Sequence, residues 1–487
     1  MNVMKRATSV LTLSGRALNE AVSFIVFCAL DLVDYVLCFF FKAMDMLIEA
    51  EWKPCYCSSS AKEAITSSGK ILVSEQGGES TKIVSLSSTK LVLEDISDTL
   101  YSRPSLVSEV SSFTLNELKK FKLEDPVLQQ QTTTKRGTSS SRCSGSSFTV
   151  NTTIVEMLQG KIGKPEKHPI PRWSDCDCNF CTSWMSSSSS LSTKHSLFVK
   201  AQGPKIGKAK EDVVFIHGFI SSSSFWTETL FPNFSSTAMS SYRLLAVDLL
   251  GFGRSPKPTD SLYTLSEHLE MIEKSVLEAH SVQSFHIVAH SLGCILALAL
   301  AVKHPHSVKS LTFLAPPFYP VPKGEAQATQ YVMRKIAPRR VWPLISLGAS
   351  LVCWYEHITR MVCFLICKNH RLWEFLTKLL TRNRVRTFLL EGFFCHTHNA
   401  AWHTLHNIIC GTAGKIGTYL DAIKDNTNIK VTIFHGKNDE VIPIECSYEV
   451  QRRIPRANVR VIDKKDHITI VVGRQKSFAR DLEEIWS

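Results

Sequence analysis

Short apolar blocks separated by amphipathic segments set the pattern of the chain from about residue 195 to its end. Apolar blocks of this length, bounded by turn-forming residues, are typical of strands buried on both faces of a parallel sheet. Between them, Thr264-Leu265-Ser266-Glu267 forms a capping box that predicts the start of a helix. The alternation predicts an α/β fold with a mostly parallel, doubly wound sheet. The predicted strands occupy residues 196–202, 213–216, 243–247, 285–290, 310–315, 430–435 and 459–462.

Residues 318–425 break this alternation and predict a helical cap inserted into the fold. Aromatic and apolar side chains fill residues 341–367, where they either form the core of the cap or line a channel for an acyl chain. Four histidines follow without the spacing of a known metal motif, so neither a metal site nor a cofactor is predicted. The cap divides the sheet domain into residues 191–317 and 426–487. The four histidines are His396, His398, His403 and His406.

An apolar stretch at residues 21–41, within an N-terminal segment of residues 1–54, is long enough to cross a membrane. Asp31 and Asp34 disfavour a simple span, because each carboxylate costs about 2.5–3.5 kcal/mol near the bilayer centre, and they share one helical face. Three interpretations stay open: a secretory signal, a signal anchor, and an amphipathic helix lying on the membrane. Basic residues before the stretch predict entry into the secretory pathway, and hence a membrane-associated or a secreted protein.

Residues 55–190 are rich in serine and threonine and lack sustained periodicity, which predicts a disordered linker. Cys55 is a candidate for lipidation, with disulfide pairing as an equal alternative. Three further cysteines, Cys176, Cys178 and Cys181, lie close together, and disulfides are favoured over zinc for them in an exported protein. Two glycosylation sequons, which matter only in an exported chain, begin at Asn151 and Asn233.

The chain carries a formal net charge of +12, with an isoelectric point near 9.0. Its basic residues are scattered, and no compact basic run interleaved with aromatic residues indicates a nucleic-acid surface. The charge favours a solvated basic surface or, more specifically, binding to an anionic lipid or cell wall polymer. The oligomeric state leaves no signature in the sequence.

Candidate chemistry is concentrated where the strand at residues 285–290 ends. Ser291 follows this apolar run, and a helix of small residues begins without a loop. In such a sharp turn the serine backbone is strained and its hydroxyl is lifted clear of the sheet. Ala289 and Gly293 flank the serine where strand and helix crowd each other. The N–H of Leu292, at the start of the helix, is in a position to stabilise an oxyanion.

Two further residues stand just after predicted strands, in an order that suits an acid and a base. Asp439 follows Ser291 by 148 positions, and His467 follows Asp439 by 28, so a parallel sheet brings all three to one edge. His467 would accept the proton of the serine hydroxyl, and Asp439 would orient the imidazole. Asp248 is a rival acid because it also ends a strand, and His290 is assigned to packing.

These motifs resemble those of the α/β-hydrolase superfamily, over residues 195–487. The second oxyanion donor is then expected from the N–H of Phe219, which follows His217 and Gly218. Alanine at position 289 departs from the usual glycine of the superfamily. The motifs are His217-Gly218-Phe219, Asp248 through Ser255, Ala289 through Gly293, Asp439 and Asp466-His467.

The whole chain resembles the plant BODYGUARD-type hydrolases in its N-terminal extension, its Ala-His-Ser-Leu-Gly turn and its cysteine cluster flanked by tryptophan. The resemblance implies an extracellular protein of epidermal cells that is needed for cuticle formation and cutin deposition. It also implies a lysophospholipase or a related lipid esterase.

The residues and the resemblance together predict a serine hydrolase that cleaves a lysophospholipid or a cutin-type fatty acyl ester through an acyl-enzyme. Its expected partners are the lipid substrate and a membrane or cell wall surface. Two alternatives stay open: an acyltransferase or polyester synthase that uses the same triad, and a non-catalytic lipid-binding or scaffold protein. Dehalogenase and epoxide-hydrolase chemistry is disfavoured, because both need an aspartate where this chain has Ser291.

Overall fold

The chain divides into two compact units, Met1–Pro104 with Trp173–Ser487, and Ser105–Arg172. The structure, a computed structural model, describes residues of the first unit. Most of the predicted linker lies outside the described residues, as do Cys55, Asn151 and the cluster from Cys176 to Cys181. The described residues are 2–44, 47, 71–74, 82–85, 90–92, 95–100, 196–204, 209–258, 261–322, 324–382, 385, 387–426 and 428–487.

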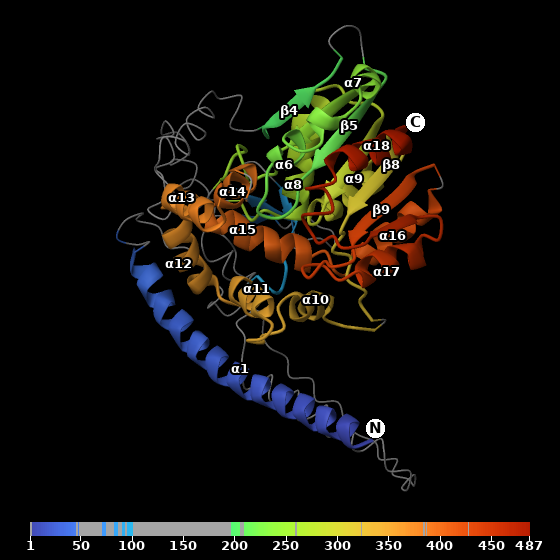
Figure 1. The fold of residues 1–487 in the computed structure, drawn as a ribbon. Coiled ribbons are helices and arrows are strands. Elements are labelled where there is room, and N and C mark those ends of the chain that lie inside the picture. Colours follow the sequence, from blue (N-terminus) through green and yellow to red (C-terminus); the bar gives the residue numbers. More distant parts are fainter. Residues whose placement is uncertain are drawn as a thin grey trace, which may run out of the picture. The chain divides into compact units, whose positions relative to one another are not determined.

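A sheet of seven strands forms the centre of the described fold, in the order β10-β9-β8-β7-β5-β6-β4 (Figure 1). All neighbouring pairs are parallel except β4 with β6. The predicted α/β fold class is therefore confirmed. The strands are β4 (Val199–Gln202), β5 (Glu211–Ile216), β6 (Tyr242–Val247), β7 (Phe285–His290), β8 (Val308–Leu314), β9 (Lys430–Gly436) and β10 (Asn458–Ile462).

Helices cover both faces of this sheet, as the uninterrupted apolar strands require. Along β5, Val214 and Ile216 belong to one hydrophobic cluster, whereas Val213 and Phe215 belong to another. The capping box at the start of α8 is present: the Thr264 N–H donates to a Glu267 carboxylate oxygen at 2.8 Å. The flanking helices are α6 (Ser224–Thr227), α7 (Ser236–Ser241), α8 (Leu265–Ile272, continued by a π-helical turn Glu273–Glu278), α9 (Gly293–Lys303), α16 (Ile416–Asp425), α17 (Glu445–Arg453) and α18 (Gln475–Trp486).

A group of helices between β8 and α16 forms the cap that the sequence predicts. The cap reaches the sheet domain through a short bridge between Phe252 and His396, and through the Gly253 N–H, which donates to the Cys395 carbonyl at 3.0 Å. The helices are α10 (Ala328–Ile336), α11 (Leu344–Trp354), α12 (Glu356–Cys367), α13 (His370–Leu380), α14 (Thr387–Phe394) and α15 (His398–Thr404), followed by a π-helical turn Leu405–Cys410.

Part of the region that the sequence assigns to a disordered linker carries regular structure, which corrects that assignment. Strands β1 (Ile71–Ser74), β2 (Lys82–Ser85) and β3 (Lys90–Val92) form a small antiparallel sheet. The Ser97 N–H then donates to the Asn407 side chain at 2.9 Å. Runs this short leave no periodic signal, and the partner of Ser97 lies 310 positions away, so inspection of the local sequence misses both.

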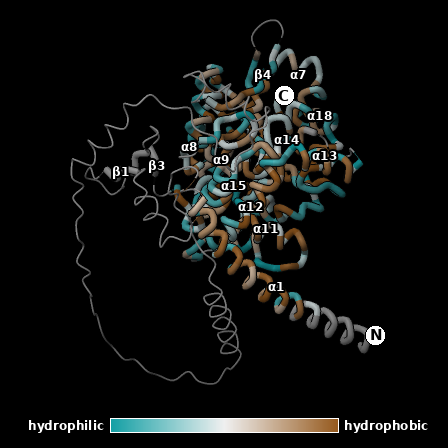
Figure 2. Tube along the Cα trace, turned by 90° about the vertical axis from the view of Figure 1, so that its left-hand side faces the viewer, coloured by the Kyte–Doolittle hydropathy of each residue, from teal (hydrophilic) through white to brown (hydrophobic). Residues whose placement is uncertain are grey.

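The predicted apolar N-terminal helix is α1 (Asn2–Met44), of which Leu18–Met44 is long and apolar enough to cross a membrane (Figure 2). Two of its acidic residues, Asp31 and Asp34, bind the cap. Asp34 is buried and accepts hydrogen bonds from the N–H groups of His357 and Ile358, both at 3.1 Å, at the start of α12. Asp31 accepts a hydrogen bond from the Tyr355 hydroxyl at 2.7 Å. The polar face of α1 is thus satisfied by protein, and its opposite face is apolar.

Replacing Asp34 by leucine is expected to destabilise the protein although it makes α1 more apolar. The buried N–H groups at the start of α12 would lose their acceptor, which costs about 1–3 kcal/mol for an unsatisfied buried group. The thermal unfolding midpoint in detergent solution should fall for Asp34→Leu. Glu20, an exposed carboxylate on the same helix, provides the control. Equal midpoints for Asp34→Leu and Glu20→Leu would contradict the contact.

Candidate active site

The backbone at Ser291 adopts the strained conformation that the sequence predicts for this turn. Ser291 has a φ of 51° between strand β7 and helix α9, a region that costs a non-glycine residue about 1–2 kcal/mol. Two hydrogen bonds hold it there: its N–H donates to the Leu314 carbonyl at 2.8 Å, and its carbonyl accepts from the Cys294 N–H at 2.8 Å. The neighbouring strand and the first turn of α9 therefore fix the serine.

Two glycines, Gly293 and Gly218, lie where helix α9 and the loop after β5 come closest to one another and to Ser291. A Cβ added to Gly293 would lie 2.6 Å from the His217 carbonyl oxygen, and one added to Gly218 would lie 3.1 Å from the Ser291 Cβ. Helix α9 therefore approaches the end of β5 at backbone distance. Ala289, the departure from the superfamily pattern, is fully buried within the hydrophobic core of the sheet, where its methyl group is accommodated.

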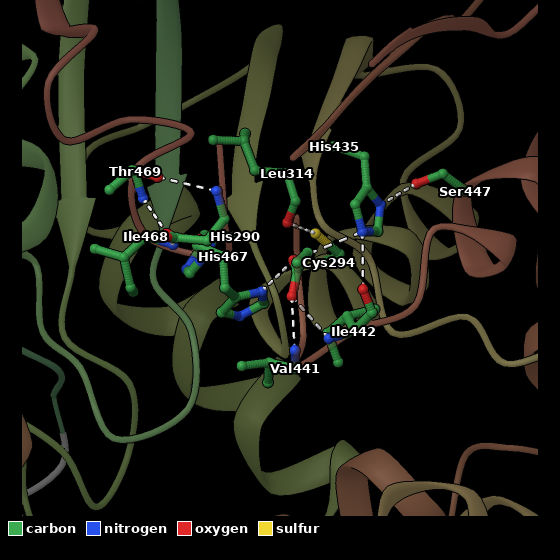
Figure 3. Close-up of polar contacts among 12 residues, drawn as sticks. His290, Cys294, Leu314, His435, Val441, Ile442, Ser447, His467, Ile468 and Thr469 are labelled. Atoms are coloured by element: carbon green, nitrogen blue, oxygen red, sulfur yellow. Dashed lines mark hydrogen bonds and ion pairs between the residues drawn. The ribbon is translucent and has the colours of Figure 1, made fainter. Parts of the chain in front are cut away.

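A hydrogen bond joins His467 (labelled in Figure 3) to Asp439 at the ends of strands β10 and β9. The His467 Nδ1 and an Asp439 carboxylate oxygen are 2.7 Å apart, so Nδ1–H is the donor and Nε2 is left as a proton acceptor. The other Asp439 oxygen accepts the N–H groups of Val441 and Ile442 at 2.9 Å each. Burial works to raise the pKa of Asp439, but the bond with His467 and these N–H groups hold that pKa below its ordinary value.

Two buried histidines support this pair, and the sequence analysis did not assign them that role. His290, beside the serine, lies with its Nε2 2.9 Å from the His467 carbonyl oxygen, so its Nε2–H donates. Its ring stacks on Phe225 at 5.0 Å, which bears out the packing assignment in part. Burial, reinforced by the nearby His467, lowers the pKa of His290 to about 3, and the ring is neutral.

The second buried histidine, His435, lies at the end of β9. Its Nε2 is 2.9 Å from the Ile442 carbonyl and 3.6 Å from an Asp439 oxygen, while its Nδ1 is 2.6 Å from the Ser447 hydroxyl. Burial lowers the pKa of His435, so a neutral ring with Nε2–H faces the carboxylate. Its position four residues before Asp439, at a strand end, is the one sequence signal that points to it.

The rival acid, Asp248, is occupied in holding loops together. Its carboxylate accepts the N–H groups of Ser223 at 2.5 Å and Arg254 at 2.8 Å. Beside it, the His217 Nε2 accepts the Leu249 N–H at 2.9 Å, and its Nδ1–H donates to the Gly218 carbonyl at 2.8 Å. Burial lowers the pKa of His217, which keeps it neutral. Asp248 and His217 thus tie together the loops that follow β5 and β6.

The two expected oxyanion donors come from the elements that meet at Ser291. Leu292 opens α9, where the first N–H groups have no acceptor within the helix. Phe219 follows His217 and Gly218 at the end of β5, and its ring packs against Phe252 at 6.0 Å.

Two other sequence-predicted features also lie in the described part of the chain. The side-chain nitrogen of Asn233 donates to the Thr229 carbonyl at 2.6 Å, so the atom that glycosylation would modify is engaged. Cys294 is fully buried, and burial raises the pKa of its thiol well above the ordinary value, consistent with a small hydrophobic residue.

Comparisons with known proteins identify the family to which the chain is similar. A family described as "alpha/beta hydrolase fold" matches residues 213–342. "Probable lysophospholipase BODYGUARD 3" of Arabidopsis thaliana is 60% identical over 503 residues, covering 100% of this chain and 99% of that protein. "Probable lysophospholipase BODYGUARD 1" of the same plant is 58% identical over 477 residues and covers 97% of each. Among solved structures, MenH from S. aureus is 16% identical with a TM-score of 0.41, covering 59% of this chain and 96% of that chain.

Gly293→Ala is expected to destabilise the fold. The new methyl group would meet the backbone oxygens of Ile216 and His217 at 2.8 and 2.6 Å, and such overpacking typically costs about 1–3 kcal/mol or more. The thermal unfolding midpoint should fall.

Gly348→Ala on α11 is the matched control for this substitution. A Cβ there meets nothing within 4 Å, so the helix should gain up to about 1 kcal/mol. Unchanged midpoints for both variants would contradict the close approach of α9 to β5.

Proposed function

The chain belongs to the BODYGUARD family of α/β-hydrolases, and from that premise we propose that it is a serine hydrolase that cleaves lipid acyl esters through an acyl-enzyme. The observation that carries the proposal is the strained Ser291 at the sheet edge that also holds the Asp439–His467 pair. Strain of this kind persists only where the surrounding structure enforces it. A serine hydroxyl also needs a neighbouring base to become a nucleophile.

In the proposed reaction, the Ser291 hydroxyl attacks the acyl carbonyl carbon while His467 Nε2 accepts its proton. Asp439 keeps the other ring proton on Nδ1 and stabilises the imidazolium that forms. The N–H groups of Phe219 and Leu292 stabilise the oxyanion. His467 then gives its proton to the departing alcohol oxygen, which leaves the acyl group on Ser291. Water, deprotonated by His467, releases the fatty acid and restores the serine.

The proposed substrate is a lysophospholipid or a cutin-type fatty acyl ester. The printed names of the relatives support the first. A role in cuticle development and cutin deposition rests on the family resemblance. If an alcohol attacked the acyl-enzyme in place of water, the same residues would catalyse acyl transfer, as in an acyltransferase or polyester synthase. Formation of a new ester on added glycerol measures this second reaction. A lipid-binding or scaffold role without catalysis would leave Ser291 dispensable.

We further propose that the protein enters the secretory pathway and works at a membrane or cell wall surface with α1 retained on the cap. The cap binds Asp31 and Asp34. Because these contacts hold α1 against the cap, we expect α1 to lie along the membrane surface and not to cross the bilayer. Its outward side chains are apolar, among them Ile25, Leu32 and Val36. Helix α13 packs on α12 as α1 does, and it exposes further apolar side chains. Amphipathic helices with such faces bury them at the headgroup boundary of a bilayer.

Fluorophosphonate labelling of the purified chain tests the nucleophile. Wild type should be labelled, whereas Ser291→Ala and His467→Ala should not, because the probe traps only an activated serine. Asp439→Asn should label about 10⁴-fold more slowly, since the imidazole would lose its orienting acceptor.

Asp466→Asn is the matched control for the acid. Asp466 adjoins His467 in sequence, but its carboxylate accepts the N–H groups of Ile468 and Thr469, contacts that asparagine also makes. It should label at nearly the wild-type rate. Labelling that persists in Ser291→Ala, or that is lost equally in both aspartate variants, would contradict the assignment of Ser291, Asp439 and His467 as a triad.

Charge placed on the outer face of α13 is expected to separate membrane binding from chemistry. Leu379 and Leu380 are 64% and 82% exposed, so Leu379→Glu with Leu380→Glu should fold normally. Sedimentation with anionic vesicles should weaken, and KM for a vesicle-borne lysophospholipid should rise. Hydrolysis of a soluble short-chain ester should not change. Equal vesicle binding by wild type and variant would overturn the assignment of this face.

A further inference from the structure

A cluster of sulfur and nitrogen atoms lies in the cap, outside the candidate active site. Cys363 and Cys367 lie one turn apart on α12, and His396 follows the end of α14. One potential ligand atom from each lies within 4.8 Å of the other two. The ligand atoms of a single tetrahedral zinc ion lie roughly 3.3–3.8 Å apart, given Zn–S and Zn–N distances of about 2.3 and 2.0 Å. Modest side-chain movement would bring the three atoms to that spacing.

The imidazole of His396 is oriented as a metal ligand would be. Its Nδ1 is 2.7 Å from the Phe393 carbonyl oxygen, so Nδ1–H donates there. The tautomer leaves a lone pair on Nε2, which lies 3.8 Å from the Cys363 sulfur. Metal-binding histidines commonly donate their other ring N–H to a carbonyl in this way, which fixes the ring and raises its basicity.

His398, two positions further along the chain, is the candidate for a fourth ligand. Neither of its ring nitrogens makes a hydrogen bond within the described part of the chain, and both nitrogens are shielded from solvent. The half-buried His398 ring stacks on Trp402 at 6.2 Å, and polar groups shielded in this way usually have a ligand or a hydrogen-bond partner. The His398 side chain lies near the Cys363 thiol.

We propose that Cys363, Cys367, His396 and His398 bind one zinc ion in a structural site of the cap. Two thiolates and two imidazoles are a donor set that zinc takes tetrahedrally, and four protein ligands leave no position for a substrate. The ion would join α12 to the turn between α14 and α15.

The zinc site would also stabilise a loop that packs against the candidate active site. The backbone of His396 bridges to Phe252, whose ring packs against His217 and Phe219 at 6.2 and 6.0 Å. Phe219 is the predicted oxyanion donor. Zinc in the cap would therefore hold, through His396, the loop against which the oxyanion segment packs.

The experiment measures bound metal on the full chain, purified under reducing conditions without chelators. Cys176, Cys178 and Cys181 are changed together to serine first, so that the other cysteine cluster contributes no zinc. In this background we expect about one zinc ion per chain, measured by inductively coupled plasma mass spectrometry. Cys363→Ser added to it should lose the zinc, and Cys395→Ser should keep it. Cys395 is the matched control because it is a buried cap cysteine next to His396 outside the cluster.

Cobalt substitution tests the site without any change to the four proposed ligands, so the result does not depend on whether a cap variant folds. Co²⁺ loaded into the background protein should give visible bands of tetrahedral cobalt and a near-ultraviolet thiolate charge-transfer band, both abolished by excess Zn²⁺. Reduced, folded background protein that takes up neither ion would overturn the proposal. A disulfide between Cys363 and Cys367 in protein isolated from its native compartment, found by peptide mapping, would also overturn it. Zinc binding is measured independently of hydrolase activity. A negative result for zinc would therefore leave the proposed hydrolase function untouched.

Discussion

The close approach of helix α9 to the end of strand β5 is the constraint on which the rest of the site depends. The backbones meet at Gly293, where even a methyl group would lie 2.6 Å from a carbonyl oxygen. That proximity forces a turn without a loop, and the turn forces Ser291 into positive φ. The strained serine therefore results from how tightly helix and sheet pack. In return, the first turn of α9 presents its N–H groups beside the serine hydroxyl.

Neutral, buried histidines fix the positions of the surrounding loops through hydrogen bonds. His217 joins the loops after β5 and β6, and His290 holds the backbone of His467. His435 faces Asp439 with an N–H group. Burial lowers the pKa of all three, so none adds a positive charge that would compete with His467 for the carboxylate. Asp439 thus faces a neutral imidazole, His435, on one side and orients His467 on the other.

Local patterns in the sequence were enough to predict the sheet, the cap and the pairing of Asp439 with His467, because each rests on strand ends and chain order. Contacts between distant segments were not predictable in this way. Nothing near Asp34 indicates that the N–H of His357 would donate to its carboxylate, and nothing near Ser97 indicates that its N–H would donate to Asn407. The cap cluster was missed for the same reason: its cysteines lie one helical turn apart, and its histidines follow about 30 positions later, a spacing that matches no common metal motif.

In the proposed mechanism, Ser291 carries the acyl group of a lipid ester. The most direct measurement is to mix the full chain with a lysophospholipid, quench with acid within the first turnover, and map peptides by mass spectrometry. The account predicts the mass of the fatty acyl group on the peptide that contains Ser291, and its absence in Ser291→Ala. Release of fatty acid with no acylated serine, or with the acyl group on another residue, would contradict it.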